Sequence, residues 1–236
     1  MEKSSVDEIR QRFDNDVERF SNLETGQSAT MDAPLVLDLI TSAAVAVNPN
    51  ARDLLDVGCG AGNYSIKMLS KVAGLNVTMI DLSKPMLDRA VRRVRATGVA
   101  GEIVPMQGDV REIELGEDRF DIILAAAVLH HLRDESQWRS VFAKFHRALR
   151  AGGSIWISDY VNHEVPAVQA MMWERYREYL VSLRDEKYRD HVQAYVERED
   201  TPMPVTFQLE LLKSVGFAKV ELLHKNSCFA AFGAVK

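Results

Sequence analysis

The sequence predicts an α/β fold in which helices cover a mainly parallel sheet. Short apolar runs alternate with longer amphipathic stretches, as in βαβ units. The run Leu54–Val57 also leads directly into glycines at positions 58, 60 and 62. Of the 236 residues, 47% are hydrophobic and 27% are charged, which is ordinary for a globular protein of this length.

The N-terminal segment is predicted to be helical. Val6, Ile9, Phe13, Val17 and Phe20 recur at steps of three and four residues, which places them on one face of a helix. A second helix is expected from Ala33 to Val47, before Asn48-Pro49-Asn50. These helices either close over a ligand or cover an apolar edge of the sheet.

The glycine-rich turn indicates a ligand site between the first strand and the next helix. Glycine tolerates unusual backbone angles and lets the backbone approach a ligand closely. The unpaired N–H groups at a helix start favour an anionic group. Dinucleotide-binding turns use G-x-G-x-x-G, whereas here the glycines are at 58, 60 and 62 and Asn63 follows. The spacing therefore disfavours a pyrophosphate.

Acidic residues follow the next two predicted strands. Asn76–Asp81 reads as a strand, and Asp81 lies about 20 residues beyond the glycine turn, as expected for a carboxylate that binds a ribose. Lys84-Pro85 then begins a helix. The third strand, Glu102–Gln107, is followed by Gly108-Asp109-Val110.

The remaining strands complete the pattern. Phe120–Ala127 is apolar enough to be central in a parallel sheet, and Val128–Leu132 forms the loop behind it. Arg147–Asp159 reads as a helix end, a glycine turn and a fifth strand. Thr206 is expected to cap a helix ending at Gly216, and 219–225 and 227–235 to form two closing strands.

These motifs resemble the class I S-adenosylmethionine-dependent methyltransferases, whose first motif is D-x-G-x-G-x-G. The resemblance covers Arg52–Asp159 closely and the C-terminal segment more loosely. It implies a Rossmann-like, seven-stranded sheet in the order 3-2-1-4-5-7-6 with the last strand antiparallel. It also implies that S-adenosyl-L-methionine is the cofactor, that Asp81 holds its ribose, and that Asp109 faces the adenine amino group. The residues expected to bind the cofactor are Asp56, Gly58, Cys59, Gly60, Gly62, Asp81, Leu82, Met86, Asp109, Val110 and Ala125.

The chain is expected to form a single domain with four parts. Residues 1–48 would be an N-terminal helical cap, 49–160 the cofactor-binding core, 161–200 a helical lid after strand five, and 201–236 the last helix and closing strands. Trp173, Tyr176 and Leu180 share one face of a lid helix. That face is either core or pocket, because a lid at this position covers the carboxyl ends of the strands.

The candidate catalytic base is His131, with His130 beside it, because both follow strand four near the expected methyl position. In the alternative, structural interpretation, a histidine at this position only stabilises the loop after strand four. Asp134 and Gln137 are interpreted as a capping box. Arg89, Arg92, Arg93 and Arg95 are interpreted as a solvated helix face.

Composition narrows the partners and the compartment. The net charge of −5 argues against a large nucleic-acid surface, so a small-molecule substrate is expected. Cys59 and Cys228 form no C-x-x-C motif, and no metal site is expected. The polar N-terminus and the absence of a long apolar run predict a cytoplasmic protein with no membrane partner. The oligomeric state does not follow from the sequence.

Two alternatives to a methyltransferase remain open. The segments 13–20, 216–222 and 229–236 resemble carboxy-S-adenosylmethionine synthases of tRNA modification, which hold a carboxylate with an arginine ahead of the last helix. Arg198 is the nearest arginine, but the residues around it match poorly and Glu199-Asp200 would repel a carboxylate. The second alternative is a non-catalytic S-adenosylmethionine sensor with a closed acceptor pocket.

Overall fold

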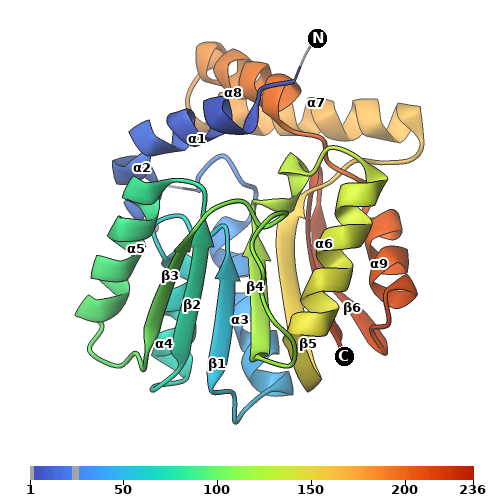
Figure 1. The fold of residues 1–236 in the computed structure, drawn as a ribbon. Coiled ribbons are helices and arrows are strands. Elements are labelled where there is room, and N and C mark those ends of the chain that lie inside the picture. The colour runs from blue at the N-terminus through green and yellow to red at the C-terminus, as the bar shows by residue number, and fades with distance from the viewer. Residues whose placement is uncertain (1–2, 23–26) are drawn as a thin grey trace.

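The computed structural model describes residues 3–22 and 27–236, and their strands form one sheet in the order β3-β2-β1-β4-β5-β7-β6 (Figure 1). β7 runs antiparallel to both β5 and β6, whereas the other pairs are parallel. The predicted fold is therefore confirmed. The strands are β1 (Asp53–Val57), β2 (Asn76–Asp81), β3 (Ile103–Gln107), β4 (Phe120–Ala126), β5 (Leu149–Tyr160), β6 (Lys219–Asn226) and β7 (Phe229–Val235).

Helices pack on both faces of the sheet (Figure 1). One face carries α3 (Ala33–Val47), α4 (Asn63–Lys71) and α5 (Lys84–Ala96), and the other carries α6 (Glu135–Ala148) and α9 (Val205–Ser214). Each face buries its own apolar cluster. Trp138, Phe142 and Phe145 are fully buried on the α6 side, and Met68 and Met79 on the other. The central strands are therefore apolar on both sides, as a parallel sheet requires.

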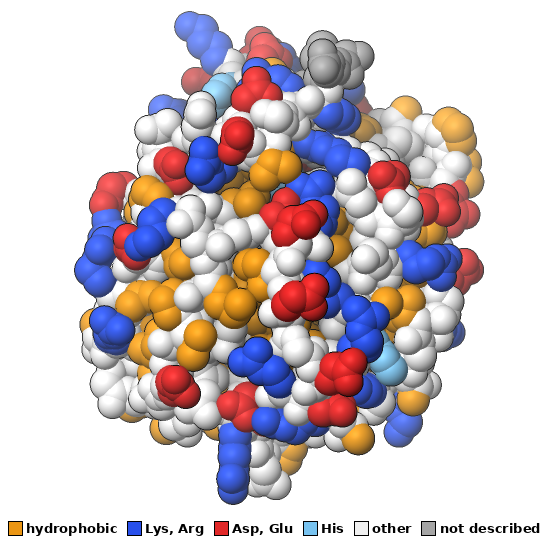
Figure 2. Space-filling view, viewed as in Figure 1, with side chains coloured by type: hydrophobic (Ala, Val, Ile, Leu, Met, Phe, Trp, Pro, Cys, Tyr) orange, Lys and Arg blue, Asp and Glu red, His pale blue; other side chains and the backbone are white. Residues whose placement is uncertain are grey.

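The connection between β3 and β4 is unusual because residues 108–119 form no helix. It crosses the face that also carries α6. The buried side chain of Lys144 holds it there, donating hydrogen bonds to the carbonyl oxygens of Val110 (2.9 Å), Arg111 (2.8 Å) and Ile113 (2.9 Å). Figure 2 shows hydrophobic side chains gathered on this face over β1–β3.

Four helices lie across the end of the sheet where the parallel strands finish (Figure 1). They are α1 (Val6–Asn15), α2 (Val17–Ser21), α7 (Pro166–Leu183) and α8 (Glu186–Glu199). Tyr176 and Leu180 of α7 pack with Tyr160 and Phe229 from the sheet in a third apolar cluster. The predicted aromatic face of the segment 161–200 therefore packs against the sheet, and its Tyr176 also lines a pocket described below.

Two local predictions were wrong. The N-terminal apolar pattern forms two helices, not one, because the chain leaves the helical path at Asp16, which caps the end of α1 through its backbone N–H. Thr206 is not the N-cap of α9: Pro204 holds that position, and the Thr206 hydroxyl instead donates to the Glu164 carboxylate. In the part of the chain that the structure describes, no helix is both long and apolar enough to span a membrane.

Candidate active site

The glycine turn after β1 has the backbone conformation that its sequence predicts. Gly58, Gly60 and Gly62 have φ values of 64°, 50° and 85°, which other residues rarely adopt. A Cβ atom at Gly58 would lie 2.6 Å from the Val128 side chain. A Cβ atom at Gly60 would meet nothing within 4 Å, so the Gly60 backbone borders open space.

The turn is fixed by the carboxylates at the ends of β1 and β2. Asp81 Oδ2 accepts a hydrogen bond from the Gly60 N–H (2.8 Å), and Asp81 Oδ1 accepts one from the Ser83 N–H (2.8 Å). Asp56 accepts from the hydroxyl and N–H of Ser65 at 2.6 and 3.2 Å, which anchors the start of α4. Burial raises the pKa of Asp56 and of Asp81 to about 6.

A groove of three adjoining compartments runs along this end of the sheet. Their empty volumes, including the open mouths, are about 520, 690 and 790 Å³. Gly58, Asp81, Leu82, Val128 and His131 line both the first and the second compartment. The second and third share Phe13, Phe20, Gln27 and Ala127.

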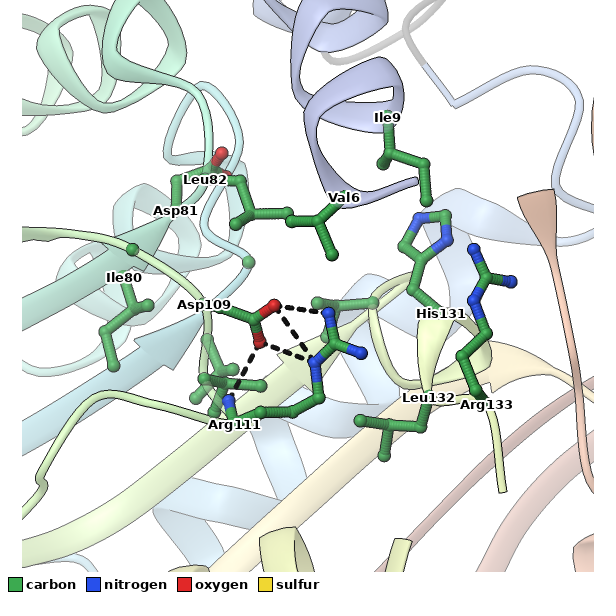
Figure 3. A pocket seen from close by; sticks show the side chains of 15 residues that line it. Val6, Ile9, Ile80, Asp81, Leu82, Asp109, Arg111, His131, Leu132 and Arg133 are labelled. Carbon is green, nitrogen blue, oxygen red and sulfur yellow. Dashed lines mark hydrogen bonds and ion pairs between the residues drawn. The ribbon is translucent and has the colours of Figure 1, made fainter. Parts of the chain in front are cut away.

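The first compartment is mainly apolar, with one charged pair. Ile80, Leu82 and Val110 line it, and Figure 3 shows Asp109 facing Arg111. Asp109 Oδ1 accepts hydrogen bonds from the Arg111 backbone N–H and Nε, both at 2.9 Å. Burial opposes the charge on Asp109, but the Arg111 guanidinium outweighs it and lowers the pKa of the carboxyl.

The second compartment lies against the glycine turn. Cys59, Gly60, Asn63, Tyr64 and Met86 line it together with Asp81. Arg93 of α5 donates to Asn63 Oδ1 (2.8 Å) and to the Ala61 carbonyl oxygen. Arg89 pairs with Glu18, whereas Arg92 and Arg95 are exposed. The prediction of a solvated arginine face therefore fits Arg92 and Arg95 but not Arg93, which stabilises the glycine turn.

The third compartment combines aromatic walls with charged groups. Tyr160, Tyr176, Tyr195 and Phe229 line it, and the buried Tyr160 hydroxyl has no hydrogen-bond partner among the described residues. The charged groups on its wall are Arg12, Arg19, His130, Asp159 and Asp200.

The two histidines after β4 lie on the short helix η1 (Leu129–His131) and differ in charge. His130 Nδ1 hydrogen-bonds to Asp159 Oδ1, and His130 Nε2 lies 3.6 Å from Asp200 Oδ1. Burial opposes protonation of His130, but Asp159 and Asp200 outweigh it and raise its pKa to about 9. Burial, and then the charge of His130, lower the pKa of His131 well below its ordinary value, which keeps this ring neutral.

Comparison with known proteins finds similarity to methyltransferases. A model described as a methyltransferase domain matches residues 54–153. The ubiquinone/menaquinone biosynthesis C-methyltransferase UbiE of Paracoccus denitrificans is 25% identical over 186 residues, which are 77% of this chain and 72% of that protein. These similarities support a class I S-adenosylmethionine-dependent methyltransferase. It is an enzyme, and S-adenosylmethionine is its cofactor.

Other relatives of this methyltransferase are named for different activities. The carboxy-S-adenosyl-L-methionine synthase of Nautilia profundicola is 25% identical over 185 residues, 78% of this chain and 76% of that protein. The 27-O-demethylrifamycin SV methyltransferase of Amycolatopsis mediterranei is 33% identical over 125 residues, 53% of this chain and 44% of that protein. Among solved structures, the [4+2]-cyclase SpnF is similar with a TM-score of 0.70 at 14% identity, covering 100% of this chain and 97% of SpnF. That likeness concerns the fold.

The groove of the methyltransferase fits its cofactor. The open space above Gly60, with Asp81 beside it, leaves room for a ligand against the backbone of the turn. Of the residues predicted to bind the cofactor, eight line the first two compartments: Gly58, Cys59, Gly60, Asp81, Leu82, Met86, Asp109 and Val110.

The structure places three predicted residues away from the groove wall. Asp56 is 2% exposed and turned toward Ser65, and Gly62 packs against Ala90 of α5. Ala125 is fully buried in the α6-side core, and its neighbours Ala126 and Ala127 line the groove instead.

Sequence reasoning missed several residues of the groove. Phe13, Phe20 and Gln27 line it from the N-terminal segment, and Asp159 and Asp200 from the ends of β5 and α8. The apolar pattern of 6–20 indicated a buried face but not what that face covers. Nothing in the sequence indicated that Asp200 would lie beside His130.

Proposed function

We propose that this methyltransferase transfers a methyl group to a small-molecule acceptor that binds in the third compartment. The observation that carries the proposal is the continuity of the second and third compartments through shared walls of Phe13, Phe20, Gln27 and Ala127. An acceptor in the third compartment would therefore lie beside a cofactor in the second. Such alignment alone contributes roughly 7–11 kcal/mol to rate acceleration.

The first two compartments would hold the cofactor. Asp81 would accept hydrogen bonds from the ribose hydroxyls, and Leu82 and Val110 would flank the adenine. Asp109 lies on the same wall, where Arg111 fixes its orientation. S-adenosylmethionine supplies an electrophilic methyl group, so the protein's main task is to align the acceptor in line with the departing sulfur.

The third compartment favours a flat, largely apolar acceptor with a polar group. The aromatic walls supply contact area, and the unpartnered Tyr160 hydroxyl is available to a polar atom of the acceptor. The names of UbiE and of the rifamycin methyltransferase also state small-molecule acceptors or pathways. His131, the candidate base, lines the first and second compartments and not the third, so its position does not favour direct proton transfer from the acceptor.

Residue positions disfavour both alternatives. In a carboxy-S-adenosylmethionine synthase an arginine would hold the additional carboxylate, but Arg198 is 54% exposed and lies outside the three compartments. A sensor would be expected to have a closed acceptor pocket, whereas the third compartment is partly open.

Mass spectrometry of the ligand retained by the purified protein tests the function. S-adenosylhomocysteine is the expected ligand, since it is the product of methyl transfer. A ligand heavier than S-adenosylmethionine by one CO2 unit would instead establish the synthase. Turnover is then measured as S-adenosylhomocysteine release with a panel of phenols, catechols and amines. Ala29→Phe, which narrows only the third compartment, should abolish turnover and retain S-adenosylhomocysteine binding.

A further inference from the structure

Three potential metal-binding side chains converge where the second and third compartments meet. Asp200 Oδ1 lies 3.6 Å from His130 Nε2 and 3.4 Å from His131 Nδ1, and one ligand atom from each residue lies within 4.8 Å of the others. His130 and His131 are neighbours on η1, whereas Asp200 follows α8. The fold therefore brings the third group to the histidine pair from a distant part of the chain.

One of these groups, His131, lacks the hydrogen bonds that buried polar groups normally make. Neither of its ring nitrogens has a hydrogen-bond partner among the described residues, although both atoms are buried. Asp200 is 7% exposed, and the only basic groups near its Oδ1 atom that the described residues supply in ion-pair range are the two histidine rings. Such unsatisfied groups are rare in folded proteins and often mark a missing water or ion.

The second shell has the arrangement that metal-binding histidines require. Asp159 accepts the Nδ1–H of His130, which fixes that ring and directs its Nε2 toward Asp200. The backbone N–H groups of Leu129 (2.7 Å) and Tyr160 (2.7 Å) fix Asp159 in turn. This carboxylate–histidine pair lies on rigid elements, the end of β5 and the loop after β4.

We propose that His130 Nε2, His131 Nδ1 and the Asp200 carboxylate bind a divalent metal ion of the Zn²⁺ class. Metal–ligand bonds of about 2.0–2.1 Å in a tetrahedral site place neighbouring ligand atoms roughly 3.3–3.4 Å apart. The separations of 3.4 and 3.6 Å from Asp200 Oδ1 are close to this value, and the histidine ligand atoms lie within 4.8 Å of each other. Two imidazoles and one carboxylate suit Zn²⁺, Fe²⁺ and Co²⁺, whereas Mg²⁺ and Ca²⁺ prefer oxygen ligands.

The local charges are compatible with a dication. With both histidines neutral, Asp159 and Asp200 give the cluster two negative charges, which a divalent ion balances. Arg12 and Arg133 are nearby, but Arg12 pairs with Glu199 at 2.7 Å, and Arg133 donates to the carbonyl oxygens of Ser4 and Glu199. Metal binding releases the Nε2 proton of His130 to solvent. The Nδ1–H of His130 keeps its hydrogen bond to Asp159.

Three protein ligands leave a fourth position open, which is typical of catalytic zinc sites. His130 and Asp200 line the third compartment, so an acceptor oxygen or sulfur atom there would complete the coordination. A bound metal lowers the pKa of such a group and thus favours its nucleophilic form. The acceptors would then carry a hydroxyl or thiol group. This step rests on the proposed function, whereas the metal site itself does not.

Titration of the untagged, metal-free full-length protein with Co²⁺ tests the site. One equivalent should bind and give visible d–d absorption of a low-symmetry site, and Zn²⁺ should displace it. His131→Ala should abolish this spectrum. The variant should also lose the increase in melting temperature that Zn²⁺ gives the wild type, each protein being compared with its own metal-free sample. His191→Ala, which alters an exposed histidine on α8, is the matched control and should behave as wild type.

The proposal is overturned if the wild type binds no stoichiometric Co²⁺, or if His131→Ala gives the wild-type spectrum. Asp159→Asn provides a further test, since loss of a second-shell carboxylate typically weakens metal binding about 10–100-fold. S-adenosylhomocysteine is titrated into the same metal-free sample. Binding there without any Co²⁺ site removes only the metal proposal, whereas failure of S-adenosylhomocysteine to bind contradicts the proposed function.

Discussion

Asp81 is the residue on which most of the cofactor argument depends. Its carboxylate accepts hydrogen bonds from the N–H groups of Gly60 and Ser83, so it organises the glycine turn as well as bordering the groove. A carboxylate has about four acceptor positions, which leaves room for two ribose hydroxyls. The structural role and the proposed ligand role are thus compatible in one side chain.

Asp81→Ala is expected to weaken S-adenosylhomocysteine binding by roughly 100-fold or more. Hydrogen bonds to charged groups contribute about 1.5–3 kcal/mol each, and about 1.4 kcal/mol corresponds to a tenfold change. Calorimetric titration measures the affinity, and thermal melting without ligand measures stability. A lower melting temperature with unchanged affinity would show that Asp81 serves only the turn. Asp88→Ala on exposed α5 surface is the control and should leave affinity unchanged.

The raised pKa of Asp81 predicts that cofactor affinity depends on pH. The folded-state pKa is about 6, above the ordinary 3.8, because of burial. In the free protein this shift means that native stability from Asp81 falls as pH rises from about 4 to 6. Ribose binding favours the ionised form, so S-adenosylhomocysteine affinity should rise through pH 6 and level off above it. At pH 5 it should be up to about tenfold weaker than at pH 7.5.

The comparison that isolates this titration is Asp81→Asn, measured over the same pH range. Its affinity should be lower at pH 7.5 and nearly constant between pH 5 and 7.5. An equally steep dependence in the variant would assign the titration to another buried carboxyl, such as Asp56, whose pKa is also about 6.

The sequence predicted individual residues well where spacing alone determines position. Asp81 and Asp109 each follow a parallel strand, so their place at one edge of the sheet follows from topology. The sequence did not predict which way a side chain points. Asp56, of the D-x-G-x-G-x-G motif, is turned toward Ser65 and not toward the groove. Ala125 and Ala126 are adjacent, and strand alternation buries the first and exposes the second to the groove.

At the scale of elements, the glycine turn joins β1 to α4 and α5 through glycines with different tasks. Gly62 precedes α4, and a Cβ atom there would lie 3.2 Å from both Cα and Cβ of Ala90 on α5. Gly60 has no such neighbour and borders the groove. One glycine permits helix packing, and the other permits close approach of a ligand.

A matched pair of substitutions should separate these tasks. Gly62→Ala should destabilise the fold by about 2 kcal/mol, from backbone strain at positive φ and overpacking against Ala90. Gly60→Ala should lower the stability only by the backbone strain of about 1 kcal/mol. It should weaken S-adenosylhomocysteine binding more strongly than Gly62→Ala does. Chemical denaturation and calorimetric titration measure the two effects. If Gly62→Ala lowers affinity more than Gly60→Ala does, the assignment of tasks is wrong.

Local patterns predicted most elements well, whereas some helix caps and the contacts between distant segments did not follow from them. The helix Ala33–Val47 and the strand Asn76–Asp81 have the predicted bounds, because their apolar periods and end signals agree. The connection 108–119 is held by the Lys144 ammonium of α6, a contact between segments far apart in the chain. Thr206 looked like a cap, yet a proline two residues earlier holds that position.

At the scale of the whole molecule, the N-terminal helix and α8 are joined above the groove. Arg12 of α1 pairs with Glu199 at the end of α8, and both the Nε (2.7 Å) and Nη2 (2.7 Å) atoms of Arg12 contact Glu199 Oε2. The Ser4 N–H donates to the Arg198 carbonyl oxygen at 3.0 Å, and Arg133 donates to the Ser4 carbonyl oxygen at 2.8 Å. Residues from opposite ends of the chain thus form one cover over the carboxyl ends of the strands.

Arg12→Ala is expected to loosen this cover while the sheet stays folded. The Glu199 side chain is 3% exposed, so removing its partner leaves a buried charge, which typically costs about 3–5 kcal/mol. Local opening of α1 and α8 avoids that cost without unfolding the core. Hydrogen exchange should therefore accelerate in 6–15 and 186–199 but not in β1 or β4, and S-adenosylhomocysteine should dissociate faster. Arg198→Ala, which removes a largely exposed arginine beside the same glutamate, should change neither. Uniform acceleration across the sheet in Arg12→Ala would show that the cover and the core unfold as one unit.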